Sequence, residues 1–264
     1  ATGDVTYTIT FNKAVTDFTA DKITLSDNAT KGTFTAATGD NAGKVFTFVA
    51  KPKANTAGNI SLNVAENTVT DAVGNKNAAA ITNSDQAFDL QAPTLAITDN
   101  VASGDATGPV TFTFTFSEAV LGFVKDLVTV TGGTAGDLVP ATGADAGKVY
   151  TLVVTPPADS IDTIKVEVPA TALASIKDAA NNTLAAAVSQ SQTVNTKAPS
   201  VTITNNVTGT AIADVTYTIT FSEAVQTFDA SKVTVTGGTK GTFTPATGAD
   251  SGKKFTLVVT PDAN

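Results

Sequence analysis

Hydrophobic and polar residues alternate along several short stretches of this chain. The clearest stretch covers residues 110–116, where every second residue is Val or Phe and threonines stand between them. The same alternation occurs over residues 5–11 and 215–221. A period of two predicts strands that bury one face, and Val, Ile, Phe and Thr favour such half-buried, pleated positions. We therefore expect an all-β protein.

The alternating stretches belong to a repeat with a period of about 105 residues. FNKAV at residues 11–15 returns as FSEAV at 116–120 and again at 221–225. Such a period is too long for a solenoid unit and is typical of small domains in tandem. Ala-Pro pairs at 92–93 and 198–199 fall between the copies, where a short stiff linker is expected.

The repeat predicts three domains, at residues 1–91, 92–197 and 198–264. Copy two is whole, whereas copy one lacks its first strand and copy three lacks its last strands. Two incomplete copies around a whole one favour a segment of a longer array.

Copy two contains seven predicted strands, separated by Gly- and Pro-rich turns. We label them A to G, and they begin near Leu95, Val110, Val128, Leu138, Tyr150, Ile164 and Val194. Seven short strands with turns every 8–12 residues are typical of an immunoglobulin-like (Ig-like) sandwich. The stretch 170–177 is expected to form a single helical turn. Burying each large apolar side chain contributes about 1.5–3 kcal/mol, so such a core needs no disulfide.

The composition excludes many chemistries. The chain has no Cys, no His and no Arg, and its formal net charge is −8. Disulfides, zinc sites of the usual kind and Ser–His nucleophilic catalysis are therefore excluded, and the acidic balance argues against a nucleic-acid partner. No apolar run approaches the 18 residues of a membrane span. An acidic glycosidase pair is disfavoured because no such pair is unique to one copy, and we expect no enzyme. GDNAGK at 39–44 lacks the spacing of a phosphate-binding loop and is expected to be a turn.

Several motifs together resemble a known family. These are the Ala-Pro-Thr start at 92–94, TFTFSEAV, VTVTGGT and the DAVGN loop of copy one, which returns as DAANN in copy two. They are similar to the tandem bacterial Ig-like domains of giant cell-surface adhesins, of the biofilm-associated and repeats-in-toxin types. The resemblance implies an extracellular extender or stalk on the bacterial surface, with tandem sandwiches arranged end to end. Neighbouring repeats would be its partners, and Ca²⁺ at domain junctions would stiffen it.

The expected topology gives that calcium a location. In an Ig-like sandwich the B–C, D–E and F–G loops share the pole at which the chain enters. In copy two these loops carry Glu118, Asp145 and Asp178, and the arriving linker carries Asp89. Since Ca²⁺ takes 6–8 oxygen ligands, we predict an interdomain calcium site of Asp89, Glu118 and Asp178, with Asp145 as a secondary candidate. The alternative is that these are solvent-facing acids of an acidic protein.

The three copies differ at these positions. Copy three keeps the glutamate as Glu223, but its linker residue is Asn195. In copy one the glutamate is replaced by Lys13, although Asp71 remains. A cation in place of a ligand argues against calcium at that pole and against a uniformly calcium-clamped rod.

Two other functions stay open. A binding module would recognise a glycan or a protein through its loops, although these loops are rich in Gly, Ala and Asp and poor in the aromatic residues common at binding hot spots. An assembly protein would complete its open copies by strand addition from other copies of the chain.

Overall fold

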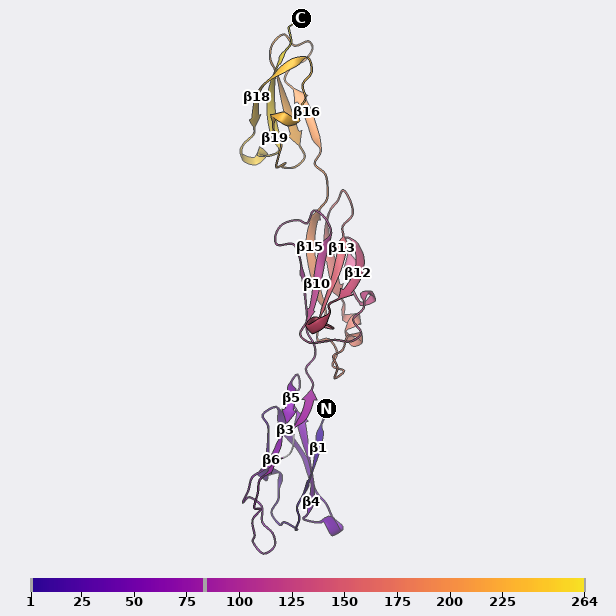
Figure 1. Ribbon diagram of the computed structural model, residues 1–264, viewed down its shortest axis with the longest axis vertical. Coiled ribbons are helices and arrows are strands. Elements are labelled where there is room, and N and C mark those ends of the chain that lie inside the picture. Colours follow the sequence, from indigo (N-terminus) through magenta and orange to yellow (C-terminus); the bar gives the residue numbers. More distant parts are fainter. Residues whose placement is uncertain (1, 83–84, 264) are drawn as a thin grey trace. The chain divides into compact units, whose positions relative to one another are not determined.

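The computed structural model describes residues 2–82 and 85–263, which form antiparallel strands joined by short 3₁₀ turns (Figure 1). The chain divides into two compact units. The first comprises the chain up to Pro157 together with Ile161–Asn195, and the second comprises Ala158–Ser160 and the chain from Thr196 onward. The first unit contains the predicted copies one and two almost entirely, and the second contains copy three. The exact domain limits stay a prediction.

Copy two is a seven-stranded sandwich, as its alternating pattern predicts. One sheet has the order β12-β13-β10-β9 and the other has the order β11-β14-β15. The strands are β9 (Leu95–Asp99), β10 (Val110–Phe116), β11 (Thr129–Thr131), β12 (Thr134–Pro140), β13 (Val149–Thr155), β14 (Ile161–Val168) and β15 (Val188–Asn195). In the letters used above the sheets are D-E-B-A and C-F-G, which is the Ig-like arrangement. The predicted fold class is confirmed.

The core of copy two lies between these sheets. Phe112 and Phe114 of β10 are fully buried, and so are Ile164 and Val166 of β14 opposite them. The threonines between the buried residues of β10 stay partly exposed. The two-residue period therefore decides which side of the strand enters the core.

Copy one has the same plan without a strand A among its described residues. Its first sheet has the order β1-β4-β3, with β1 (Val5–Thr10), β4 (Val45–Pro52) and β3 (Ala29–Ala36). The facing strands are β2 (Ile23–Leu25), β6 (Leu62–Val64) and β7 (Ile81–Thr82), with β5 (Ala57–Ile60) paired to β8 (Gln86–Asp89). Strand F is thus divided at Ser61 into β5 and β6.

Copy three contains a single sheet among its described residues. Its order is β16-β17-β19-β18. The strands are β16 (Val201–Asn205), β17 (Val215–Phe221), β18 (Gly238–Pro245) and β19 (Lys254–Pro261). These correspond to strands A, B, D and E of copy two.

Short 3₁₀ helices connect the strands. They are η1 (Ala20–Lys22), η2 (Gly39–Asn41), η3 (Lys125–Leu127), η4 (Gly143–Asp145), η5 (Ala170–Ser175), η6 (Ala230–Lys232) and η7 (Gly248–Asp250). Helix η5 lies where a single turn is predicted, and η2 shows that the GDNAGK stretch is a turn. Within residues 2–82 and 85–263, no helix has both the length and the apolar character needed to cross a membrane.

Candidate metal centre

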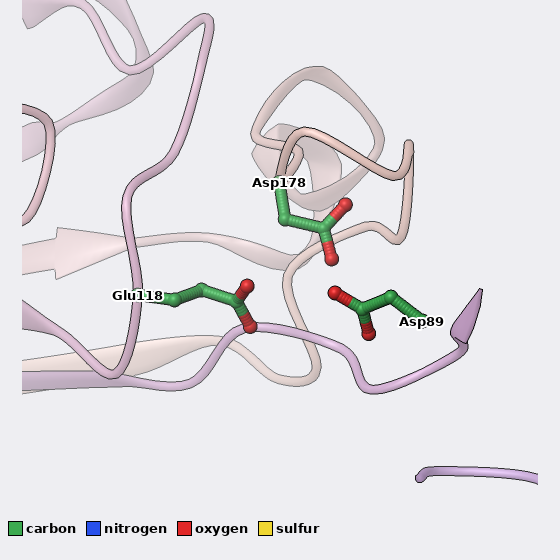
Figure 2. A group of neighbouring side chains, drawn as sticks. All are labelled: Asp89, Glu118 and Asp178. Carbon is green, nitrogen blue, oxygen red and sulfur yellow. The ribbon is translucent and has the colours of Figure 1, made fainter. Parts of the chain in front are cut away.

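Three of the predicted ligands converge in the structure. Asp89 lies at the end of β8, Glu118 in the loop after β10, and Asp178 in the loop between β14 and β15. One carboxylate oxygen of each lies within 4.8 Å of those of the other two, and the side chains point toward one another (Figure 2). Asp178 is only 2% exposed, and the other two are half-buried.

The loop that carries Glu118 is fixed at both ends. Phe116 at the end of β10 contacts Phe123 edge to face, with 5.0 Å between the ring centroids. Between them, the amide of Val120 donates to the carbonyl of Gly147 in the D–E loop at 2.9 Å. Since an edge-to-face aromatic pair and a backbone hydrogen bond hold this short loop, the Glu118 side chain has a defined starting position.

Asp178 is held by its neighbour Asn182. The backbone amide of Asn182 donates to Oδ1 of Asp178 at 2.8 Å, and the Asn182 side-chain amide donates to Oδ2 at 2.7 Å. Leu121 and Lys177 exchange backbone hydrogen bonds at 2.6 and 3.1 Å, which joins the Glu118 loop to the Asp178 loop. These contacts orient a buried carboxylate that would otherwise be costly.

The same asparagine also reaches the linker. Its side-chain amide lies 3.3 Å from the main-chain carbonyl oxygen of Asp89. Further along the linker, the carbonyl of Pro93 accepts a hydrogen bond from Ala185 at 3.0 Å. The F–G loop of copy two is therefore bonded directly to the segment that arrives from copy one.

The group concentrates negative charge. The pKa of Glu118 is raised above its usual value, first by burial and then by the charges of Asp178 and Asp89, while Lys148 opposes the shift. The ion pairs Lys22–Asp17 and Lys165–Glu167 lie elsewhere. An arrangement of carboxylates that disfavours its own ionisation is suited to a bound cation.

Asp145 is not part of this group. It ends η4 in the D–E loop, and its side chain is exposed. The D–E loop does reach the same pole, but through the Gly147 carbonyl rather than a carboxylate. Topology correctly assigns the loop to the pole, whereas the direction of a side chain within a 3₁₀ turn does not follow from topology.

Asn182 is the residue that the sequence argument missed. A signal for it exists in the repeat, because Asp71 and Asn75 of copy one have the same spacing and make the same contacts. The Asn75 amide donates to Oδ1 of Asp71 at 2.9 Å and its side chain donates to Oδ2 at 3.0 Å. In copy one the pKa of Asp71 is lowered, chiefly by these bonds, with a smaller contribution from Lys13.

Comparisons with known proteins agree with this architecture. A family model described as a bacterial Ig-like domain matches residues 1–87, 89–196 and 195–264. Among curated proteins, none matches the sequence.

Two solved structures are similar over most of the chain. FdeC, described as an Escherichia coli adhesin, has 18% identity over 98% of this chain and 83% of its own, with a TM-score of 0.40. The S-layer protein rSbsC(31–844) has 12% identity over 100% of this chain and 50% of its own, with a TM-score of 0.19.

Proposed function

Because the chain belongs to the family of bacterial Ig-like domains, we propose that it is an extender segment of a large bacterial surface protein. In this role consecutive repeats hold an adhesive module away from the cell. The observation that carries the proposal is the reuse of one fold with separate cores. Among residues 2–82 and 85–263, the buried cluster of copy two lies within residues 97–194 and that of copy one within residues 7–88.

Separate cores suit a spacer, because each complete repeat buries its own apolar surface and needs little from its neighbours. The linker at Ala92-Pro93 is short, and proline restricts its backbone. The net charge of −8 keeps neighbouring arrays soluble and mutually repelling. The role requires no catalytic residue.

We further propose that Asp89, Glu118 and Asp178 bind a calcium ion. Ca²⁺ ligands lie at 2.3–2.6 Å, so two oxygens on opposite sides of the ion are about 4.6–5.2 Å apart. The spread of 4.8 Å among the three carboxylate oxygens is compatible with a shared ion. An all-oxygen set of anionic ligands favours a hard cation over zinc or copper. The ion would join the end of β8 to two loops of copy two and stiffen the linker.

Calcium titration of the full chain tests this site. With an affinity in the range of extracellular calcium modules, about 10 mM calcium should raise the free energy of unfolding of copy two by about 1.4–2.7 kcal/mol. Glu118→Gln should remove most of this rise. In chelator at pH 7 the same variant should be more stable than the wild type, because the raised pKa of Glu118 means that its charged form disfavours folding.

Glu223→Gln is the matched control, since it changes the same position of the same motif in copy three, where the linker residue is Asn195. It should leave the calcium response intact. The calcium site would be contradicted if calcium did not raise the free energy of unfolding of the wild type, or if it raised that of Glu118→Gln equally. Neither result would contradict the extender role.

The extender role is tested by X-ray scattering on residues 92–197, 1–197 and 1–264. A strand of seven or eight residues measures about 25 Å. We therefore expect the maximum dimension to grow by about 30–40 Å with each added repeat, once the loops are included. A maximum dimension that scarcely grows would contradict a spacer, whatever the calcium result.

A further inference from the structure

A group of phenylalanine rings packs together in copy one, and the same arrangement recurs in copy three. In copy one the ring of Phe34 in β3 stacks on Phe46 in β4, with 5.6 Å between the centroids and 21° between the planes. In copy three Phe243 stacks on Phe255 with the same distance and angle. Phe34 and Phe243 are half-buried, so each closes its group of rings toward solvent.

Copy two has a leucine in place of the stacked ring. Leu138 of β12 holds the place in the register of β12 and β13 that Phe34 holds in that of β3 and β4. A leucine has no ring to stack on Tyr150, the counterpart of Phe46. The other aromatic rings of this group make edge-to-face contacts as in copy one, and they are Phe116, Phe123 and Tyr150.

A pocket of about 360 Å³ lies at this position, and we call it the Leu138 pocket. Its apolar lining includes Phe123, Val124 and Tyr150, and its charged lining includes Lys125 of η3 and Asp137 of β12. These charges are specific to copy two. The counterparts of the two charged residues in the other copies are Ala20 and Ala230, and Thr33 and Thr242.

The lysine beside the pocket has also changed element. In copy one Lys31 of β3 donates to the carbonyl of Ala20 in η1 at 2.9 Å. In copy two Lys125 of η3 donates to the carbonyl of Ala135 in β12 at 3.3 Å. The 3₁₀ turn and the strand are thus joined in both copies, but in copy two the ammonium group belongs to the turn that borders the pocket.

We propose that the Leu138 pocket binds the ring of a Phe or Tyr side chain of a partner polypeptide, with an acidic neighbour that meets Lys125 and a basic neighbour that meets Asp137. The ring would lie against Tyr150 as Phe34 lies against Phe46. Aromatic side chains are common anchors at interfaces, where they fill a pocket inside a polar rim. The volume is sufficient, since a cavity of about 150 Å³ binds benzene. This interaction surface goes beyond the proposed extender function.

A second copy of the chain is a poorer partner than a different polypeptide. Among the described residues, the exposed large hydrophobic side chains are all Val, Leu or Ile. A second copy therefore offers the pocket no exposed ring from these residues. Val124, which lines the pocket, is 53% exposed, whereas its counterparts in the other copies are the polar residues Thr19 and Asp229. An apolar side chain at this position favours contact with a partner.

NMR titration of the full chain with the end-blocked tripeptide Glu-Phe-Lys tests the proposal. So short a peptide can enter the pocket in either chain direction. We expect the amide signals of residues 123–125, 138 and 150 to shift and to saturate with a dissociation constant on the order of 1 mM. The end-blocked tripeptide Glu-Leu-Lys should bind at least about threefold more weakly, because it loses the stacking contact.

Leu138→Phe fills the pocket with the ring that the other copies have and should weaken Glu-Phe-Lys binding at least about tenfold. Val139→Thr is the matched control. It places the counterpart of Thr35 at the next position of β12, and successive side chains of a strand point to opposite faces. This variant should bind the tripeptide as the wild type does.

Equal affinity for the two tripeptides, or unchanged affinity in Leu138→Phe, would overturn the proposal. So would shifts centred away from the pocket. The double variant Lys125→Ala with Asp137→Thr gives an independent measurement on exposed residues. It should weaken Glu-Phe-Lys binding about two- to fivefold through the loss of two surface ion pairs, and unchanged affinity would contradict the assigned role of the charges.

Discussion

Asp17 and Glu118 are carboxylates whose surroundings shift their pKa values in opposite directions. Asp17 lies 2.7 Å from the Lys22 ammonium and accepts the Thr70 amide at 2.8 Å. These contacts, with the Lys22 hydrogen bond first, lower its pKa to about 2. Glu118 has burial and two further acids around it, and its pKa is raised. Lys22 makes a direct ion pair with Asp17, whereas the charge of Lys148 opposes the shift at Glu118 without reversing it.

The lowered pKa of Asp17 predicts a loss of stability in acid. A carboxyl with a depressed folded-state pKa stabilises the fold above its usual pKa, and this contribution is lost as the pH falls from about 4 to about 2. Asp17→Asn keeps an acceptor for the Thr70 amide but loses the charge. We expect the variant to be less stable at pH 7 and the difference to shrink across this window, measured by urea unfolding against pH.

Asp21→Asn controls for net charge in that experiment, since it removes a neighbouring exposed carboxylate. At pH 7 its stability should stay within about 0.5 kcal/mol of the wild type. Parallel pH profiles for Asp17→Asn and the wild type would show that the Lys22 pair does not stabilise the native state.

The sequence predicts those residues of the candidate site whose position depends only on which loop of the Ig-like fold carries them. Loop membership places Glu118 and Asp178 at one pole, and chain order brings Asp89 to them. The exposed position of Asp145 depends on the conformation of η4, which the loop sequence does not specify. The repeated spacing of Asp178 and Asn182 marks the asparagine in the sequence, but its hydrogen bond to the Asp89 carbonyl is known only from the structure.

At the scale of elements, the hairpin between β11 and β12 offers a paired measurement. Gly132→Ala and Gly237→Ala place the same side chain in the same left-handed backbone, which costs about 1–2 kcal/mol. Only the first also forces a Cβ against the Thr163 carbonyl. We expect Gly237→Ala to destabilise copy three by about this amount and Gly132→Ala to destabilise copy two by clearly more, measured by chemical denaturation.

Equal losses in the two variants would mean that β14 can move aside without cost, so that close packing against Gly132 is not needed. An unrelated surface substitution in each copy, such as Thr115→Ala and Thr220→Ala on the exposed sides of β10 and β17, separates this effect from general differences between the two units. Both should change stability by less than about 0.5 kcal/mol.

Period-two alternation predicts most strands because burial on one face is a local property of the sequence. The alternation does not predict whether a stretch forms a strand when this depends on the presence of a partner strand. Residues 128–134 and 233–239 are identical, yet residues 129–131 form β11 whereas the equivalent residues 234–236 have no strand assignment. Likewise, strand F is continuous as β14 in copy two but divided at Ser61 in copy one, where β5 pairs with β8 and β6 with β2 and β7. Both differences depend on partners distant in sequence.

At the scale of the whole molecule, the repeat period predicts tandem sandwiches because one apolar pattern recurs with the same spacing. The structure adds that, among the residues it describes, the buried clusters of copies one and two share none. Cores that do not share side chains should respond separately to substitution, since effects at distant, independent sites add. This separation distinguishes tandem modules from one fused domain.

Phe114→Ala and Phe48→Ala measure that separation directly. Each removes a fully buried ring from the centre of one core and should cost that repeat about 3–5 kcal/mol. Hydrogen exchange across the full chain measures each repeat separately. Phe114→Ala should lower the protection of amides in β10, β13 and β14 and leave that of β1, β4 and β6 unchanged. Phe48→Ala should have the opposite effect. The double variant should show the sum of the two effects within about 0.5 kcal/mol. A loss of protection that spreads from either substitution into the other repeat would mean that the two sandwiches unfold as one cooperative unit. Adding repeats to such a chain would change the stability of the repeats already present.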